Sequence, residues 1–380
     1  MNLGRPKRRP SSRTAIVAAT VSVTLEKFFP EYVRQLQSEG YGVWLVCAPS
    51  ADVPNLRTQH PEATIVTIPM KRQIALLSDV FALLRWIGLL LRTRPQIVVT
   101  MTPKASLLGQ LSARLVRVPN RLYATGGLRL EGSAGWPRRI LWLFEKITCM
   151  AASEVVANSP SLGNAYIVNK LASQPKIRWT VPGSSHGVDT TEFYPRHDVS
   201  DREKDPVIGF VGRLTEDKGI FTLLDACEIL APRMPLQLLI VGPADESDSR
   251  EILRLMRDKP YGVRYVGFVD DVRPQIAEMR MLVLPSRREG FPNVVLEAAA
   301  MGVPSIVADS TGTRDSVRHL ETGHVVPVGD AEALALSIET LLLDSPTCKE
   351  YGAQARRWAE ESFVPREVVR SVLGLDAKRP

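Results

Sequence analysis

The chain has 380 residues, of which 44% are hydrophobic and 23% are charged. This balance is typical of a folded globular protein and excludes a disordered or fibrous chain. The length allows two domains that each bury a core. The 48 basic residues outnumber the 41 acidic ones, which gives a formal net charge of +7. That charge favours anionic partners such as nucleotides, phospholipid surfaces or nucleic acid, without choosing among them.

Residues 1–13 form a basic tail that also contains proline and serine, and its cations are Arg5, Lys7, Arg8, Arg9 and Arg13. We expect this tail to be disordered and able to touch a membrane. The apolar run after it soon meets Glu26 and Lys27, so it predicts a first strand and not a signal peptide.

The cysteines have no paired spacing, so neither a zinc cluster nor a disulfide framework is indicated; they are Cys47, Cys149, Cys227 and Cys348. A reducing cytosol fits this pattern best. The most apolar later segment, 74–91, contains Asp79 and Arg85, which argues against a membrane-spanning helix. No transmembrane segment is predicted.

Apolar, β-branched runs alternate with helical patterns through both halves of the chain. The predicted strands are 14–19, 42–48, 63–69, 96–101, 121–125, 154–158, 176–181, 207–212, 236–242, 262–268, 281–285 and 304–308. Uninterrupted apolar strands in such an alternation predict parallel sheets that helices cover on both faces. The fold class is therefore α/β.

A polar stretch bounded by prolines interrupts this alternation and predicts a linker at 195–206. It separates a Rossmann-like first domain, 14–194, from a second one, 207–362, and 363–380 is predicted to hold a terminal helix. Ligands of doubly wound sheets bind at the carboxyl ends of the strands, so we expect the site in the cleft between the domains.

One stretch, from Leu284 to Ala308, combines a strand, a loop with Glu289, a helix with Glu297 and a second strand. Free N–H groups at a helix start attract phosphate, and carboxylates accept hydrogen bonds from hydroxyls. A nucleotide sugar offers both groups. As isolated glutamates, the two acids would be more typical of solvated surface positions.

A second cluster follows the first strand of the second half, with Gly212, Arg213 and Lys218. The glycine admits a ligand close to the backbone, and the two cations can neutralise a diphosphate. A turn glycine followed by two solvated cations is the alternative. Gly242, at the end of a later strand, is equally consistent with a simple turn.

These residues carry a resemblance to a known family. The pattern E-G-F-P-N-x-x-L-E-A-x-A-x-G-x-P at 289–304 resembles the signature of the retaining glycosyltransferases of family 4, and G-R-x-x-x-x-K-G at 212–219 is similar to a second signature of that family. The resemblance implies the GT-B fold, in which two Rossmann-like doubly wound domains face a central cleft. It also implies that the terminal helix crosses back onto the first domain.

The resemblance assigns Glu289 to the transferred sugar, Glu297 to the ribose, and Arg213 with Lys218 to the donor diphosphate. It places the base beside the backbone of Val269 and Asp270, near the loop at Gly242. The further donor-binding positions are Gly212, Gly290, Phe291, Pro292 and Asn293. Phe291 and Asn293 are the expected N–H donors because proline has none. No metal and no cofactor is implied, since the nucleotide sugar is a substrate.

First-domain motifs resemble a narrower subgroup, the capsule- and O-antigen-type enzymes. They are T-P-K-A-x-L-L-G at 102–109, G-L-R-x-E-G at 127–132 and N-S-P-S-L at 158–162. The resemblance implies a polyprenyl-diphosphate-linked saccharide as acceptor, with phosphate contacts from Lys104 and Arg129 and a hydroxyl contact from Glu131. Solvated cations are the alternative.

The first loop lacks the glycine pair common in relatives, so Gly126 and Gly127 are the predicted substitutes. His186 lies near the expected cleft.

Two stretches predict contact with an anionic membrane surface. In the first, Trp136, Arg138, Arg139 and Trp142 combine aromatic and basic side chains. The other is the apolar helix at 74–91 with its preceding cations Lys71 and Arg72. Core packing is the more usual explanation of an apolar stripe at helical spacing.

The leading hypothesis is therefore a retaining, metal-independent hexosyltransferase-type enzyme. It would move a sugar from a nucleotide diphosphate, expected to be a UDP-sugar, to a lipid-linked saccharide in cell-surface polysaccharide biosynthesis. We expect it to be cytoplasmic and peripheral at the inner face of the membrane, with no nucleic-acid partner. Two alternatives stay open: a nucleotide-sugar epimerase or hydrolase on the same fold, and a non-catalytic membrane-associated partner of another transferase.

Overall fold

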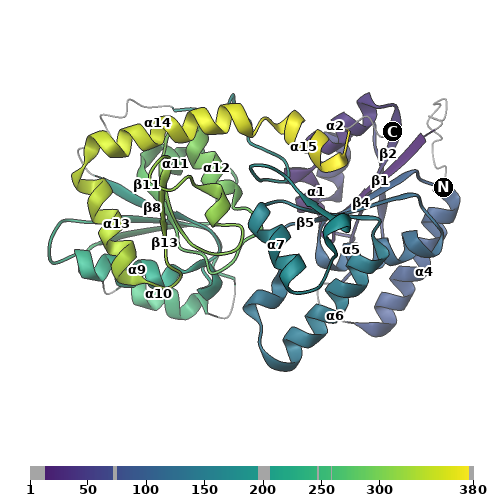
Figure 1. The fold of residues 1–380 in the computed structure, drawn as a ribbon, viewed down its shortest axis with the longest axis horizontal. Helices are drawn as coiled ribbons and strands as arrows, with labels where there is room; N and C mark the ends of the chain where they lie inside the picture. Colours follow the sequence, from purple (N-terminus) through teal and green to yellow (C-terminus); the bar gives the residue numbers. More distant parts are fainter. Residues whose placement is uncertain (1–12, 72–74, 196–205, 246–247, 258, 376–380) are drawn as a thin grey trace.

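Two parallel sheets stand side by side in the computed structural model, which describes residues 13–71, 75–195, 206–245, 248–257 and 259–375 (Figure 1). The predicted tail up to residue 12, Arg72 and the linker from 196 to 205 lie outside the described residues. The fold prediction is confirmed, because each sheet is doubly wound and covered by helices.

The first sheet has seven parallel strands in the order β3-β2-β1-β4-β5-β6-β7. They are β1 (Arg13–Ala18), β2 (Tyr41–Cys47), β3 (Thr64–Thr67), β4 (Ile97–Thr100), β5 (Asn120–Thr125), β6 (Glu154–Ala157) and β7 (Ile177–Trp179). Arg13, predicted in the disordered tail, instead begins β1 opposite Tyr41, with its guanidinium carbon 4.3 Å from the centre of the Tyr41 ring. The order reverses between β1 and β4, and a binding crevice opens at such a switch point.

Seven α-helices of the first domain precede β7 in the described chain. They are α1 (Ser22–Phe28), α2 (Pro30–Ser38), α3 (Val53–Gln59), α4 (Leu76–Thr93), α5 (Pro103–Leu115), α6 (Gly135–Ala151) and α7 (Pro160–Val168). The single helix predicted near 26–38 is two helices, because Pro30 has no N–H to continue α1 and instead begins α2.

The second sheet has six parallel strands in the order β10-β9-β8-β11-β12-β13. They are β8 (Val207–Val211), β9 (Gln237–Val241), β10 (Gly262–Gly267), β11 (Met279–Leu284), β12 (Ser305–Ala308) and β13 (Gly323–Val326). Its helices are α9 (Ile220–Leu230), α10 (Ser249–Arg257), α11 (Arg273–Glu278), α12 (Asn293–Ala300), α13 (Ala331–Leu343) and α14 (Ser345–Ser362). Every residue of the central strand β11 is buried, as expected of a strand with helices on both faces.

The last helix, α15 (Pro365–Leu373), returns to the first domain and packs on α2 (Figure 1). Its residues Val369, Val372 and Leu373 are buried in the core that covers one face of the first sheet. The Arg178 guanidinium, at β7, also donates to the carbonyl oxygens of Ser371 and Val372, both at 2.7 Å. The chain end therefore ties the second domain to the first.

All four cysteines are buried as free thiols. Among the helices that the structure describes, none is both long and apolar enough to cross a membrane.

The buried face of α15 generates a stability prediction. Val369→Ala removes two methyl groups from a fully buried side chain, so it should lower the free energy of unfolding by about 2 kcal/mol. The exposed Arg366→Ala change on the same helix should alter it by less than about 0.5 kcal/mol. Urea unfolding of both variants measures these differences, and equal midpoints for the two would contradict the packing of α15.

Candidate functional site

Two adjoining cavities lie where the carboxyl edges of the sheets face each other. The larger, of about 970 Å³, is lined by α1, α2 and the loop after β7 on one side and by residues 269–273 on the other. The smaller, of about 620 Å³, lies between the loop after β5 and the loop before α12. Phe28, Asn293 and Glu297 line both cavities, so the two join beside the start of α12.

The backbones of the two domains come close together at a pair of glycine loops. A Cβ atom added to Gly290 would lie 2.2 Å from the carbonyl oxygen of Gly126, and one on Gly127 would lie 3.5 Å from the Gly290 nitrogen. Only glycine at position 290 fits this contact, because a Cβ there would overlap the first-domain backbone. This contact keeps the backbone on either side of Gly290 next to the first domain.

An ion pair joins the two predicted catalytic residues Lys218 and Glu289 in the smaller cavity. Ser286 Oγ donates a hydrogen bond of 3.0 Å to the same carboxylate oxygen. The side chains of Lys218 and Glu289 are only 18% and 15% exposed, so water screens the pair poorly. Arg213 and Gly212 line the same cavity, as predicted.

A further cation, Arg288, enters this cavity although the sequence analysis did not select it. Its guanidinium lies 3.1 Å from an Asp217 carboxylate oxygen. Burial opposes ionisation of Asp217, yet the Thr215 hydroxyl and the nearby cations, Arg288 first among them, together lower its pKa. The smaller cavity is thus lined by four cations, Arg129, Arg213, Lys218 and Arg288.

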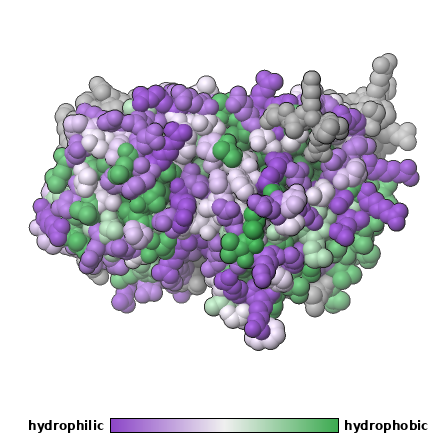
Figure 2. Space-filling view, in the orientation of Figure 1, coloured by the Kyte–Doolittle hydropathy of each residue, from purple (hydrophilic) through white to green (hydrophobic). Residues whose placement is uncertain are grey.

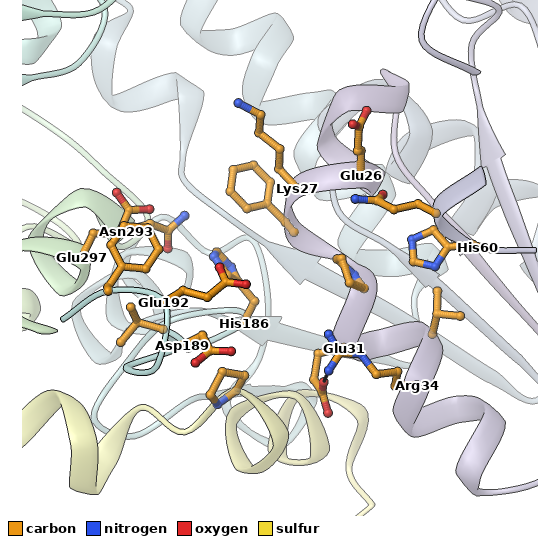
Figure 3. A pocket seen from close by; sticks show the side chains of 18 of the residues that line it. Glu26, Lys27, Glu31, Arg34, His60, His186, Asp189, Glu192, Asn293 and Glu297 are labelled. Carbon is orange, nitrogen blue, oxygen red and sulfur yellow. Dashed lines mark ion pairs between the residues drawn. The ribbon is translucent and has the colours of Figure 1, made fainter. Parts of the chain in front are cut away.

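Glu297 lies beside Asn293 at the wall of the larger cavity (Figure 3), and it lines the smaller cavity as well. Burial raises the pKa of its carboxyl to about 7, and the charge of Lys27 opposes this rise. Its carboxyl makes no hydrogen bond or ion pair with the residues that the structure describes. A partly buried carboxyl without a partner is well prepared to accept hydrogen bonds from a ligand's hydroxyls.

The larger cavity also contains the predicted residues Val269, Asp270 and His186. Burial lowers the pKa of His186 to about 4, so its ring is neutral at neutral pH. Nδ1 of that ring lies 3.0 Å from Ser185 Oγ, and the ring packs 4.9 Å from that of Phe28. His186 therefore lines the cavity as a polar, uncharged side chain.

The backbone before α12 lines the smaller cavity through Gly290, Phe291, Pro292 and Asn293. The Phe291 ring packs against Phe363, with 5.6 Å between ring centres, so we assign its backbone and not its ring to the cavity. The first N–H groups of a helix have no acceptor within the helix. At α12 the Val295 N–H donates to the Pro292 carbonyl oxygen at 3.1 Å, so those of Asn293 and Val294 are the ones available to an anion.

Some predicted first-domain residues line the smaller cavity, and others do not. Arg129, Gly126 and Gly127 do. Lys104 instead pairs with Asp79 on α4, with 2.6 Å between ammonium nitrogen and carboxylate oxygen. Glu131, predicted to bind an acceptor hydroxyl, accepts a hydrogen bond of 2.9 Å from the Thr311 hydroxyl of the second domain.

Gly242 lies behind the smaller cavity and lines neither of the two. Its φ is +143°, and a Cβ there would lie 1.8 Å from the Gly212 carbonyl oxygen. Gly242 therefore permits the Gly212 loop to take its position, which is a different contribution from the predicted contact with the donor.

The residues predicted at a membrane surface divide between exposed and half-buried positions on α6. Trp136 is 73% exposed, and the Arg139 guanidinium carbon lies 5.6 Å from the centre of its ring. Arg138 is exposed and donates to the Asn169 side-chain oxygen at 3.1 Å. Trp142 is half-buried and donates its indole N–H to the Asn169 carbonyl oxygen at 2.8 Å, so it belongs to the domain's own packing.

Within the described part of the chain, no group of three His, Cys, Asp or Glu side chains is arranged to hold a metal ion.

The two facing doubly wound domains, with α12 beginning at their cleft, define a glycosyltransferase of the GT-B fold. Its structure is similar to that of Alr3699/HepE from Anabaena, solved with UDP and glucose, with a TM-score of 0.78 and 18% identity, covering 97% of this chain and 100% of that one.

Comparison with protein families gives the particular group. Residues 205–344 match the family Glycosyl transferases group 1, and residues 24–179 match the family Glycosyl transferase 4-like domain. The capsular polysaccharide biosynthesis glycosyltransferase CapM of Staphylococcus aureus is 34% identical, over 92% of each chain. An Escherichia coli UDP-Gal:alpha-D-GlcNAc-diphosphoundecaprenol alpha-1,3-galactosyltransferase is 22% identical, over 84% of this chain and 83% of its own. The chain belongs to the group 1 glycosyltransferases of family 4, as the motifs predicted.

The raised pKa of Glu297 predicts how stability depends on pH. An acid whose folded-state pKa lies above its ordinary value stabilises the fold fully below that ordinary value, and the contribution is lost as the pH rises through the folded pKa, here about 7. Between pH 4.5 and 8, the loss should reach at most about 3 kcal/mol.

Unfolding of the wild type and of Glu297→Gln in urea at pH 5 and pH 8 measures this loss. The glutamine variant should gain stability relative to the wild type at pH 8. The exposed Glu361→Gln variant is the control and should show no such trend. A stability difference between wild type and Glu297→Gln that is equal at both pH values would contradict the assignment.

Proposed function

We propose that this glycosyltransferase transfers a sugar, with retention of configuration, from a UDP-sugar to a lipid-linked saccharide during synthesis of a cell-surface polysaccharide. The observation that carries the proposal is the junction of the two cavities at Glu297. This junction lies between the larger cavity, which suits a nucleoside, and the smaller, cation-lined cavity, which suits a diphosphate and a sugar. Glu297 would accept hydrogen bonds from the ribose hydroxyls between them.

The diphosphate would lie beside Arg213, Lys218 and the start of α12 in the smaller cavity. Phosphate oxygens would compete with Glu289 for the Lys218 ammonium, because both are anions within reach of one cation. Release from this ion pair would leave the Glu289 carboxylate to accept hydrogen bonds from the hydroxyls of the transferred sugar. Donor binding would thereby prepare both catalytic side chains in one step.

In the reaction, the bond between the anomeric carbon and the β-phosphate oxygen breaks, and the acceptor hydroxyl oxygen bonds to that carbon from the same face. The hydroxyl proton passes to an oxygen of the departing diphosphate. Charge develops on that leaving group, and Arg213, Lys218 and the N–H groups at α12 stabilise it, in the role that a divalent metal has in other transferases. The neutral His186 ring adds no competing positive charge in the adjoining cavity.

Three comparisons support the donor and acceptor in this proposal. The Anabaena structure was solved with UDP and glucose. The name of the Escherichia coli relative specifies a UDP-sugar donor and a diphosphoundecaprenol-linked acceptor. CapM, the relative at 34% identity, is named for capsular polysaccharide biosynthesis. We place the acceptor on the first-domain side of the smaller cavity, beside Gly126, Gly127 and Arg129.

A lipid-linked acceptor requires the enzyme to reach a membrane surface, and α4 supplies an unpartnered apolar face. Its side chains Leu77, Val80, Phe81, Leu84 and Leu91 follow helical spacing and are between 51% and 92% exposed. The exposed cations Arg85, Arg92 and Arg94 lie on or next to this helix. Figure 2 shows apolar surface at the lower right, where Figure 1 places α4.

Helix α6 extends this face, because α4 and α6 both pack on α5. Its exposed large apolar residues are Trp136, Ile140 and Leu143 in its first half and Met150 near its end. An apolar face edged by arginines fits an anionic lipid surface, which attracts the cations and receives the apolar side chains. We therefore propose α4 as the principal membrane-contacting helix, with the start of α6 beside it.

The catalytic assignment predicts the effect of changing Glu289 and Lys218. Glu289→Gln and Lys218→Met should each lower kcat by about 100-fold to 1000-fold, since each removes a charge beside the reacting groups. Purified protein is incubated with a panel of nucleotide sugars and a polyprenyl-diphosphate-linked saccharide, and the products are identified by mass spectrometry. Glu361→Gln, a change at an exposed residue that lines neither cavity, is the control.

The same assay separates the alternatives. Loss of donor without lengthening of the acceptor would indicate an epimerase or hydrolase. Absence of turnover by the wild type, together with normal glycan assembly in cells that carry Glu289→Gln, would indicate a non-catalytic partner and contradict the proposal.

The membrane assignment predicts the effect of polar changes on α4. The double variant Phe81→Ser, Leu84→Ser should bind anionic phospholipid vesicles at least about tenfold more weakly, because it removes two apolar side chains from the interface. Leu336→Ser, Leu343→Ser is a matched control, since both leucines are exposed on a second-domain helix, α13. Vesicle sedimentation measures both, and equal loss in the two variants would contradict the choice of α4.

A further inference from the structure

One loop of the second domain, residues 309–316 after β12, lies between the first domain and the Glu289 backbone. The Glu289 N–H donates to the Thr311 carbonyl oxygen at 2.9 Å. A Cβ on Gly312 would lie 2.2 Å from the Gly290 carbonyl oxygen and 2.5 Å from that of Glu289. The loop therefore supports the Glu289–Gly290 segment through close backbone contact.

The same loop is attached to the first domain at two points. The Thr311 hydroxyl donates to Glu131 at 2.9 Å. Asp315 accepts two hydrogen bonds from Ser161, one from its N–H at 2.9 Å and one from its hydroxyl at 2.5 Å. The Gly312 N–H donates in turn to the Ser161 hydroxyl oxygen at 2.7 Å. Ser161 is in the first turn of α7, where a carboxylate is favoured by the helix dipole.

The first of these attachments is shielded from water. Burial raises the pKa of Glu131, and its second carboxyl oxygen is buried without a hydrogen-bond partner among the described residues. Arg288 packs over the neighbouring Gly132, where a Cβ would lie 2.5 Å from its Nε. A hydrogen bond in such a setting contributes more than an exposed one, and its loss leaves a buried polar group unsatisfied.

We propose that Thr311 and Asp315 are positioning residues, which hold the Glu289 backbone in register with the first domain so that its carboxylate reaches the sugar only when the domains are closed. This inference rests on the proposed function of Glu289. The cations at Arg213 and Lys218 and the Glu297 carboxyl are attached to other segments. Loss of the loop's attachment should therefore slow transfer and leave nucleotide binding unchanged.

Three substitutions test this proposal. Thr311→Val removes the hydroxyl and keeps the side-chain shape, whereas Thr311→Ser keeps the hydroxyl and removes the methyl group. Asp315→Asn removes the charge at the start of α7. We expect Thr311→Val and Asp315→Asn to lower kcat for sugar transfer by about tenfold to 100-fold, as a displacement near 1 Å does at reacting groups. Thr311→Ser should keep at least about half of the wild-type kcat, since its hydroxyl can donate to Glu131.

The readout that separates positioning from general damage is UDP affinity, measured by titration calorimetry on the same proteins. It should stay within about twofold of the wild-type value in all three variants, because Lys218 and Glu297 are attached to segments other than the loop at 309–316. Glu39→Gln is a matched control: it breaks the 3.0 Å ion pair with Arg370 where α15 meets α2, a second contact between chain end and first domain far from Glu289. Its kcat and UDP affinity should equal those of the wild type.

Each outcome decides one claim. A wild type that transfers no sugar to the lipid-linked acceptor overturns the proposed function. A wild type that transfers sugar while Thr311→Val matches its kcat overturns only the positioning role. A parallel fall of kcat and UDP affinity in Thr311→Val also overturns that role, because it would mean that the substitution disturbs the second domain as a whole.

Discussion

The close approach of Gly290 to the Gly126 carbonyl oxygen is the constraint on which the rest of the cleft depends. A side chain at position 290 would collide with the first-domain backbone, so the two sheets could not meet at this distance. This contact places the start of α12 opposite the loop after β5 and borders the smaller cavity. It also brings Glu289 next to the first domain, where the Glu289 N–H donates to the carbonyl oxygen of Thr311.

Several charged groups in this cleft are poorly solvated and incompletely hydrogen-bonded within the protein. Lys218 and Glu289 neutralise each other while largely out of water, and Glu297 is partly buried without a partner among the described residues. Buried charges are costly unless they are paired and fully hydrogen-bonded. A diphosphate and its ribose would supply the missing partners. The donor site is thus built from groups whose hydrogen bonding the donor itself completes.

The fold and the second-domain half of the site were largely predictable from the sequence. Apolar β-branched runs identified most strands, and motifs with fixed spacing placed Lys218, Glu289 and Glu297 in one cavity region. Two elements escaped prediction: β13 begins with Gly323 and His324 and so lacks the continuous apolar run of equally short strands such as β4 and β12, and α11 has six residues, too few to display a helical period. At α1 and α2, one apolar pattern continues across Pro30, so it concealed the break between two helices.

Contacts between the domains could not be predicted, because their partners are far apart in the sequence. Glu131 and Thr311 are separated by 180 positions, and neither residue type signals such a hydrogen bond. The motif around Lys104 predicted a phosphate contact for this cation, and only the structure shows that it pairs with Asp79 on α4. The Trp142 side chain likewise belongs to an apolar stripe, and only the fold shows that its indole N–H is used at Asn169.

The central claim is that one nucleotide sugar spans both cavities with its ribose at Glu297. A crystal structure of the protein with UDP bound tests this claim most directly. The account predicts ribose hydroxyls within hydrogen-bond distance of the Glu297 carboxyl, the base beside Val269 and the diphosphate beside Arg213 and Lys218. A nucleotide that occupies another surface, or one whose ribose lies away from Glu297, would contradict it.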